Sequence, residues 1–284
     1  MRVSMTTSAG TAGRPNEDFV GAVPGAVVLL DGAGIPGTES ICRHGVAWYT
    51  HRLGGALLGR LSRGDGRDLT AILADTIGEV AAEHRGTCDL GNPGSPQATV
   101  LIVRADGDRL DHLLLADSFL VLDQVRGGPE VVTDGREATA RRVCSAPLEG
   151  VPPGTAEYDR VRASCVEALR ARRNQPGGYW IAKDDPRAAE EAVTGSRPLH
   201  DLHGVALLSN GASRIVSPYG LTGWPGVLDL LAADGPAGVV RLVRQAEDRA
   251  AGGPEARVPD DATVAHCTQL PHPAAPEGAD SCRS

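Results

Sequence analysis

The chain has 284 residues, of which 41% are hydrophobic and 23% charged, a balance typical of globular proteins. Its formal net charge of −8 and the lack of any basic run argue against a nucleic-acid partner bound through phosphate neutralisation. No stretch approaches the roughly 18 apolar residues of a membrane-spanning helix. The N-terminal residues also lack the apolar core of a signal peptide, so we expect a cytoplasmic protein with no membrane partner.

The first half of the chain has strand signals before and after a pair of helix signals. Residues 2–7 predict a first strand, and the continuous apolar run 26–30 (AVVLL) is typical of a buried strand. Apolar residues recur at helical spacing in 45–61 and again in 69–83, which predicts two consecutive amphipathic helices. Short apolar segments bounded by turn residues then predict a meander of three strands at 98–104, 110–116 and 118–124.

The second half continues with helices at 157–172, 224–232 and 236–250 and strands at 179–182, 203–209 and 262–269. Residues 271–284 lack core material and predict a disordered tail. Strands dominate the centre and both ends, and helices come in pairs. This order favours an α+β fold of two stacked, mainly antiparallel sheets flanked by helices, an αββα sandwich that spans residues 1–270 as one domain.

The cysteines give no obvious motif. The six of them are scattered over the chain, at Cys42, Cys88, Cys144, Cys165, Cys267 and Cys282. No CxxC pair occurs, so the spacing supports neither a zinc knuckle nor a redox motif, and reduced thiols are expected.

Acidic residues stand at the ends of predicted strands. Asp31-Gly32 follows the strand 26–30 directly, Asp260-Asp261 precedes the last strand, and Asn16-Glu17-Asp18 lies in an early loop. Carboxylates that converge at one rim of a sheet repel each other unless cations lie between them. Mg²⁺ and Mn²⁺ prefer such oxygen ligands, and two of them can activate a shared water molecule towards phosphorus.

Each of these motifs alone is common turn chemistry, and only their order is informative. In that order they resemble the metal-dependent serine/threonine phosphatases of the protein phosphatase 2C (PPM-type) family, particularly its actinobacterial members. The matching segments are Arg14–Asp18, Leu30–Gly34, Ala116–Ser118, Ser209–Arg214 and Asp260–Val264. The resemblance spans residues 1–269.

The resemblance implies a centre of two Mn²⁺ or Mg²⁺ ions. Asp31 would bridge the two ions, the carbonyl of Gly32 would complete one of them, and Asp260 would bind the other. Asn210 stands where the family has a metal-binding Asp. The implied reaction is hydrolysis of phosphoserine or phosphothreonine in a protein substrate by a hydroxide that bridges the metals.

The resemblance also implies supporting roles around these ions. Glu17 and Asp18 would hold metal-bound water molecules, and Asp117 would contact a third, weaker metal. Arg14 would clamp the substrate phosphate through its planar set of donors.

Several positions depart from the family pattern, among them the following three. Asn210 brings no negative charge, Arg214 falls near a position where the family has an acidic metal ligand, and Ala116 replaces the glycine of Gly-Asp-Ser. These departures keep open a second hypothesis, a catalytically weak or silent pseudophosphatase with a binding or regulatory role. The oligomeric state and the physiological substrate have no sequence signal.

Other motifs are weaker. Residues 32–37 match GxGxxG after a strand, but the following helix 45–61 carries no acidic residue and Pro36 stands where the helix of a dinucleotide site begins. The pair His200 and His203 would need helical spacing to share a metal, whereas 203–209 reads as a strand, so a surface turn is expected.

Overall fold

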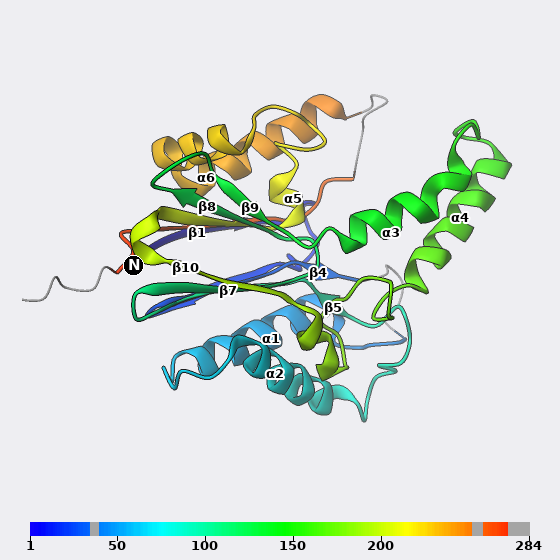
Figure 1. Ribbon diagram of the computed structural model, residues 1–284. Coiled ribbons are helices and arrows are strands. Elements are labelled where there is room, and N and C mark those ends of the chain that lie inside the picture. Colours follow the sequence, from blue (N-terminus) through cyan, green and yellow to red (C-terminus); the bar gives the residue numbers. More distant parts are fainter. Residues whose placement is uncertain (35–39, 252–257, 272–284) are drawn as a thin grey trace, which may run out of the picture.

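The computed structural model describes residues 1–34, 40–251 and 258–271. Two five-stranded sheets lie face to face, with helices on both outer faces (Figure 1). The β1 sheet has the order β1 (Arg2–Ser8), β12 (Ala262–Thr268), β11 (Leu202–Leu208), β8 (Phe119–Gln124) and β9 (Glu130–Val132). The β2 sheet has the order β10 (Val193–Pro198), β7 (Arg109–Leu115), β6 (Val100–Asp106), β3 (Ala26–Leu30) and β2 (Phe19–Val23). Every pairing within these sheets is antiparallel, which confirms the predicted fold class.

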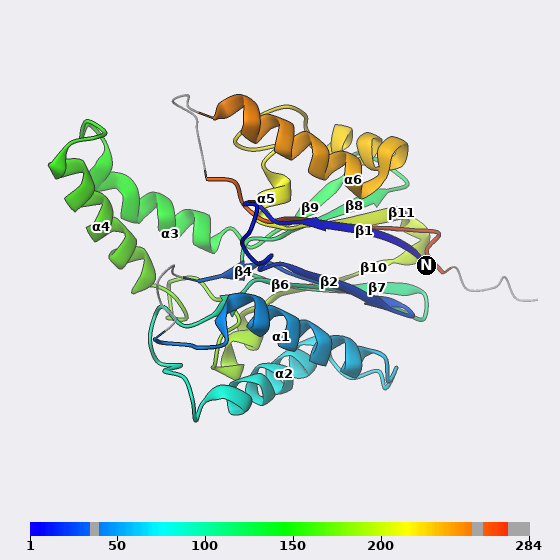
Figure 2. The ribbon, with the colours of Figure 1, turned by 180° about the vertical axis from the view of Figure 1, so that it is seen from behind.

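Helices cover the sandwich from both sides (Figure 2). The helices α1 (Gly45–Leu61) and α2 (Leu69–His84) pack on the β2 sheet, while α5 (Asn210–Ser213) and α6 (Trp224–Ala250) pack on the β1 sheet. The helices α3 (Arg136–Ser145) and α4 (Ala156–Arg170) project from one end of the sandwich. Short 3₁₀ turns complete the chain at η1 (Ala146–Leu148), η2 (Pro186–Glu191) and η3 (Leu199–Asp201).

The strand β3 shows why the sandwich forms. All five of its residues are buried, and successive side chains point to opposite faces of the sheet. Val27 and Leu29 belong to the core between the two sheets, whereas Val28 and Leu30 belong to the core beneath α1 and α2. Burying each such side chain contributes about 1.5–3 kcal/mol, so a strand with two apolar faces is stable only inside a layered fold.

The helix boundaries follow local chemistry. Asp68 begins α2 by accepting the backbone N–H groups of Thr70 and Ala71 at 2.8 and 3.3 Å. The two helices predicted at 224–232 and 236–250 are both present within α6, and a break at Gly235, where φ is 68°, separates them. Pro236 follows this break and cannot continue the preceding helical hydrogen bonds.

Two strand predictions are wrong. The predicted meander fails because β7 and β8 lie in different sheets. The chain crosses between the sheets at Ala116, whose φ of 70° turns the backbone sharply. Residues 179–182 form only isolated bridges, from Tyr179 to Arg173 and from Ala182 to Ala98.

Further differences concern short elements. The predicted strand 98–104 is divided at Thr99 between β6 and β5 (Gln97–Ala98), which pairs with β4 (Gly32–Ala33). The sequence prediction missed the elements β2, β9, β10 and α3, which have weak or mixed apolar patterns. From residue 272 onwards the predicted tail lies outside the described residues, as does Gly37 of the GxGxxG match. In the described part of the chain, no helix combines the length and the apolar character needed to cross a membrane.

Candidate active site

A cleft opens at the end of the sandwich from which α3 projects. Its volume is about 1140 Å³. Of the residues predicted for the site, those that line it are Glu17, Asp31, Gly32, Asp117, Asn210 and Asp260. They come from loops that are far apart in sequence, between strands of both sheets. The cleft therefore gathers the acidic strand ends at one rim.

Asp31 is held at the end of β3 by its own backbone. Its N–H donates to the Thr99 hydroxyl at 3.1 Å, and its carbonyl accepts the N–H of Thr99 at 2.9 Å. Gly32 lies so close to the neighbouring loop that a Cβ atom there would be 2.3 Å from the carbonyl oxygen of Glu17. Glycine at this position therefore lets the loop with Glu17 approach the Asp31 backbone.

Asp261 anchors this early loop. One oxygen of its carboxylate accepts the N–H of Gly10 at 2.8 Å, and the other accepts the N–H of Glu17 at 2.6 Å. A Cβ at Gly10 would be 2.5 Å from the backbone of Asp260, so the loop packs directly on the segment before β12. Sequence reasoning treated Asp260-Asp261 as one motif and did not separate the second residue's role as an anchor.

Asp18 lies behind the lining residues and is only 3% exposed. Burial raises the pKa of Asp18 to about 7, the charges of Asp261 and Asp260 add to this rise, and nearby hydroxyls of Thr263 and Ser209 oppose it. Neither carboxylate oxygen has a partner within hydrogen-bond geometry among the described residues. A buried carboxylate without a partner is stable only if it takes up a proton or a cation.

The neighbouring carboxylates have raised pKa values as well. Burial, followed by the charges of Asp18, Asp260 and Asp117, raises the pKa of Asp31 well above its usual range. Burial raises the pKa of Asp117 to about 6, with a further contribution from the charge of Glu137. This mutual repulsion in a cleft of oxygen donors fits the binding of hard divalent cations.

Asn210 connects two of these acidic residues. It begins α5, and its backbone N–H donates to Asp31 Oδ2 at 3.0 Å. Its side-chain amide donates to Asp117 Oδ2 at 2.9 Å. An aspartate here would add a third negative charge, whereas the asparagine supplies a donor. Asn210 therefore partly replaces the stabilisation that a cation would give Asp117.

Arg214 places a fixed positive charge in the cleft. Its Nη2 contacts Asp260 Oδ2 at 2.6 Å, and its Nη1 donates to the carbonyl of Val258 at 2.9 Å. The buried Glu247 holds the same guanidinium at 3.4 Å. Burial raises the pKa of Asp260, and Arg214 opposes this rise. The donor set thus fits divalent cations, but Asn210 and Arg214 reduce its negative charge.

Arg14 lies apart from the other predicted residues. It is exposed in the early loop and is not among the described residues that line the cleft. Its charge is near enough to lower the pKa of Glu17, although burial and the charges of Asp261 and Asp260 raise that pKa overall.

Sequence reasoning missed the arginines that do line the cleft, Arg141, Arg142 and Arg173. Arg141 is paired with Glu137 on α3, and Arg173 donates to the Tyr179 hydroxyl at 3.0 Å and to the carbonyl of Pro93 at 3.1 Å. The basic pair Arg141-Arg142 was visible in the sequence. Its place over the cleft depends on α3, which the apolar pattern did not predict.

The architecture is similar to that of bacterial phosphatases of known structure, although the sequence alone matches no family. No protein-family model matches the sequence, and no curated protein matches it. The serine/threonine phosphatase PstP/Ppp of Mycobacterium tuberculosis is similar in structure, with a TM-score of 0.57 and 19% identity over 94% of this chain and 97% of that one. The catalytic domain of PstP in complex with two manganese ions gives a TM-score of 0.53 and 20% identity over the same shares, 94% and 97%.

A third structure agrees with these two. The PPM Ser-Thr phosphatase MsPP of Mycobacterium smegmatis, in complex with cacodylate, has a TM-score of 0.56 and 18% identity over 94% of this chain and 98% of that one. The chain therefore shares the fold of bacterial serine/threonine phosphatases of the protein phosphatase 2C type.

Proposed function

We propose that residues 1–270 form a metal-dependent protein phosphatase domain that hydrolyses phosphoserine or phosphothreonine with two Mn²⁺ or Mg²⁺ ions. The carboxylate of Asp18 carries this proposal, because it is buried without a partner beside Asp31 in an acidic cleft. The two manganese ions of the similar PstP structure support it.

In this proposal the metal ligands come from strand ends. Asp31, the Gly32 carbonyl, Asp260 and Asn210 would hold the ions, and Asp117 would contact a third one. Bound divalent cations would lower the pKa of a water molecule and neutralise charge on the transferred phosphoryl group. Glu17 and Asp18 would orient water molecules around these ions through their carboxylates.

The remaining residues bind the substrate. Arg141 and Arg173 line the cleft, so they attract a phosphate dianion towards the acidic centre. Arg14 does not line the cleft, but its charge reaches Glu17, so in this proposal it would clamp the phosphate from that side. The cleft has a volume of about 1140 Å³, which leaves room for a phosphorylated segment of a protein.

The direct test is turnover of p-nitrophenyl phosphate and of a phosphothreonine peptide with Mn²⁺ and with EDTA. We expect activity that needs Mn²⁺ and is lost in Asp31→Ala. Asp75→Ala, which changes an exposed carboxylate on α2, is the matched control and should retain activity. Turnover that continues in EDTA and in Asp31→Ala would refute the metal mechanism.

A second candidate function rests on Asn210 and Arg214. Because one supplies a donor to Asp117 and the other pairs with Asp260, the cleft can be stable with few or no cations and serve as a silent binding fold. The double variant Asn210→Asp, Arg214→Ala restores charge to the cleft. An inactive parent whose double variant gains Mn²⁺-dependent turnover would support the silent function, and an active parent would reject it.

A further inference from the structure

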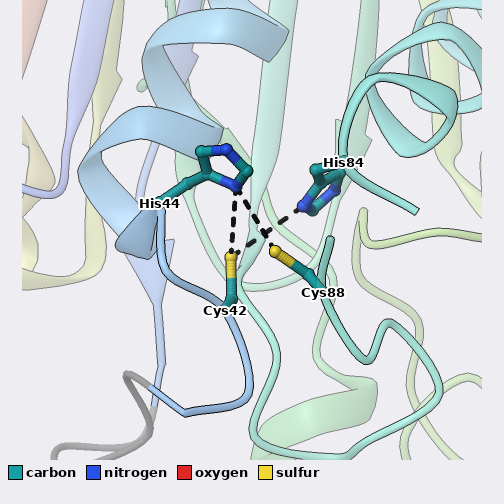
Figure 3. A group of neighbouring side chains, drawn as sticks. All are labelled: Cys42, His44, His84 and Cys88. Atoms are coloured by element: carbon teal, nitrogen blue, oxygen red, sulfur yellow. Dashed lines mark hydrogen bonds between the residues drawn. The ribbon is translucent and has the colours of Figure 1, made fainter. Parts of the chain in front are cut away.

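Four side chains from two separate segments meet beside the α1–α2 layer (Figure 3). Cys42 and His44 precede α1, His84 is the last residue of α2, and Cys88 follows shortly after. One ligand atom from each residue lies within 4.8 Å of the other three. The pairs read as Cys-x-His and His-x₃-Cys, so a search for CxxC pairs does not find them.

The spacing of the atoms suits one metal ion. The Cys88 Sγ atom is 3.4 Å from His44 Nδ1, and Cys42 Sγ is 3.9 Å from the Nδ1 atoms of both His44 and His84. In a tetrahedral zinc site with bonds of about 2.3 Å to sulfur and 2.05 Å to nitrogen, sulfur and nitrogen lie about 3.6 Å apart. The observed separations fall on both sides of this value.

The surroundings hold these side chains in place. Cys42 is 4% exposed and His84 is 1% exposed. The ring of Trp48 stacks on that of His44 with centroids 4.4 Å apart. The N–H of Asp89 donates to the carbonyl of Ile41 at 3.0 Å and so joins the two segments through their backbones.

The imidazole of His84 turns one nitrogen towards the cluster. Its Nδ1 faces the Cys42 sulfur atom at 3.9 Å, whereas Nε2 has no partner in the described part of the chain. The five cysteines of the described residues are free thiols, so Cys42 and Cys88 are not joined to each other.

We propose that Cys42, His44, His84 and Cys88 bind one Zn²⁺ ion. Each thiol gives a proton to solvent, and the two thiolates balance the charge of the ion, which leaves a neutral group suited to burial. Thiolate and imidazole donors select zinc over the hard cations of the acidic cleft. Four protein ligands leave no open position, so the ion is structural rather than catalytic.

The zinc ion would link two connections that lead to the cleft. The Cys42 segment comes from Asp31 and β4, and the Cys88 segment leads into β5, which pairs with β4. The ion would therefore hold the segment before α1 and the segment after α2 together. This structural role does not depend on the proposed phosphatase activity.

The test loads the full chain with Zn²⁺ under a thiol reductant, removes excess metal and measures zinc by mass spectrometry. We expect about one zinc per chain in the parent and a loss of roughly tenfold or more in Cys42→Ser and Cys88→Ser. Cys144→Ser, which alters a buried thiol on α3, is the matched control and should retain the zinc. Asp31→Ala should also retain it, because the acidic cleft is a separate site.

Cobalt substitution of the parent keeps the test decisive if the cysteine variants fail to fold. Co²⁺ bound by two thiolates gives sulfur-to-metal charge-transfer absorption, which carboxylate ligands do not give. A parent without this absorption would overturn the proposal. So would zinc content that persists in both cysteine variants, zinc that is lost only in Asp31→Ala, or a Cys42–Cys88 disulfide that resists the reductant and excludes zinc.

Discussion

The acidic cleft and the Cys–His cluster (Cys42, His44, His84 and Cys88) differ in the ligand atoms and in the charge that they offer to a cation. The cleft crowds several carboxylates, and burial, together with the charges of neighbouring carboxylates, raises the pKa of Asp18 and Asp31. The cluster offers imidazoles and thiols, and a metal that binds there displaces the protons of the thiols. Repulsion between carboxylates therefore favours protons or cations in the cleft, whereas the cluster contains no carboxylate.

The two regions also differ in how far other side chains of the protein neutralise their charge. Arg214 pairs with Asp260, and Asn210 donates to Asp117, so part of the cleft is already neutralised by the protein. The cluster has no charged partner of this kind among its four members. A hard cation and a soft cation should therefore bind at separate places, and variants can separate the two.

The largest expected effect is on turnover, which should depend on the acidic cleft and not on the Cys–His cluster. Asp31→Ala should lower Mn²⁺-dependent turnover by about 10³-fold, because several kcal/mol of charge stabilisation depend on the cations it holds. Cys88→Ser should leave the turnover per folded molecule near that of the parent. Steady-state kinetics on both variants, with metal contents, checks this. Equal losses of activity in the two variants would show that the regions act as one.

The second prediction concerns pH in protein freed of divalent cations. The pKa of Asp18 rises from 3.8 to about 7 on folding, so the native state keeps a proton that the unfolded chain has released. This stabilisation is complete below about pH 4 and is lost as the pH rises through about 7, by roughly 2–4 kcal/mol.

Urea unfolding of the cation-free protein at pH 5 and pH 8 measures this loss. In Asp18→Asn the difference between the two pH values should shrink, because the amide does not titrate and resembles the neutral acid in shape. An unchanged difference would mean that other groups dominate the cleft.

The third prediction tests how strongly Arg214 neutralises the acidic cleft. Arg214→Ala frees Asp260, while Arg244 still pairs with Glu247 and keeps that buried carboxylate neutralised. Mn²⁺ should bind about tenfold more tightly, since metal affinity rises with the charge of the ligand set. Titration calorimetry with Mn²⁺ measures the change, and Arg241→Ala, which pairs with Asp234 away from the cleft, is the control. Weaker binding in Arg214→Ala would assign the arginine a supporting role.

The smallest expected effect lies at the crossover between the sheets. Ala116 is 2% exposed and has a φ of 70°, a region that favours glycine. Ala116→Gly should raise stability by about 1 kcal/mol and the Tm by about 2 °C. Calorimetry checks this, with Ala105→Gly on β6 as a control that should be destabilised. A lower Tm in Ala116→Gly would mean that the methyl group is worth more in packing than it costs in backbone strain.

The sequence predicted the long elements well. The periodic run 45–61 is α1, and the apolar run AVVLL is β3, because a full apolar face or a fully buried strand leaves a strong local pattern. The short strand β10 and the helix α3 carry mixed patterns, and their place depends on contacts with distant segments. The predicted meander is wrong because one turn at Ala116 sends β8 into the other sheet.

In the acidic centre, too, the sequence predicted the local features and missed the contacts between distant segments. Strand-end position marked Asp31 and Asp260, the family resemblance added Asp117, and all three line the cleft. Sequence could not show that Asp18 is buried without a partner or that Arg214 pairs with Asp260, since both depend on distances across the fold. It could not show the arginines over the cleft for the same reason.

By itself, the sequence determined a layered α+β sandwich and the acidic residues at its strand ends, because periodicity and strand termini are local properties of the chain. Only the tertiary structure decided which charges meet, which of them are compensated, and that Cys42, His44, His84 and Cys88 come together. The physical reason is that electrostatic energy and metal geometry depend on separations of a few ångströms between segments that sequence order leaves far apart.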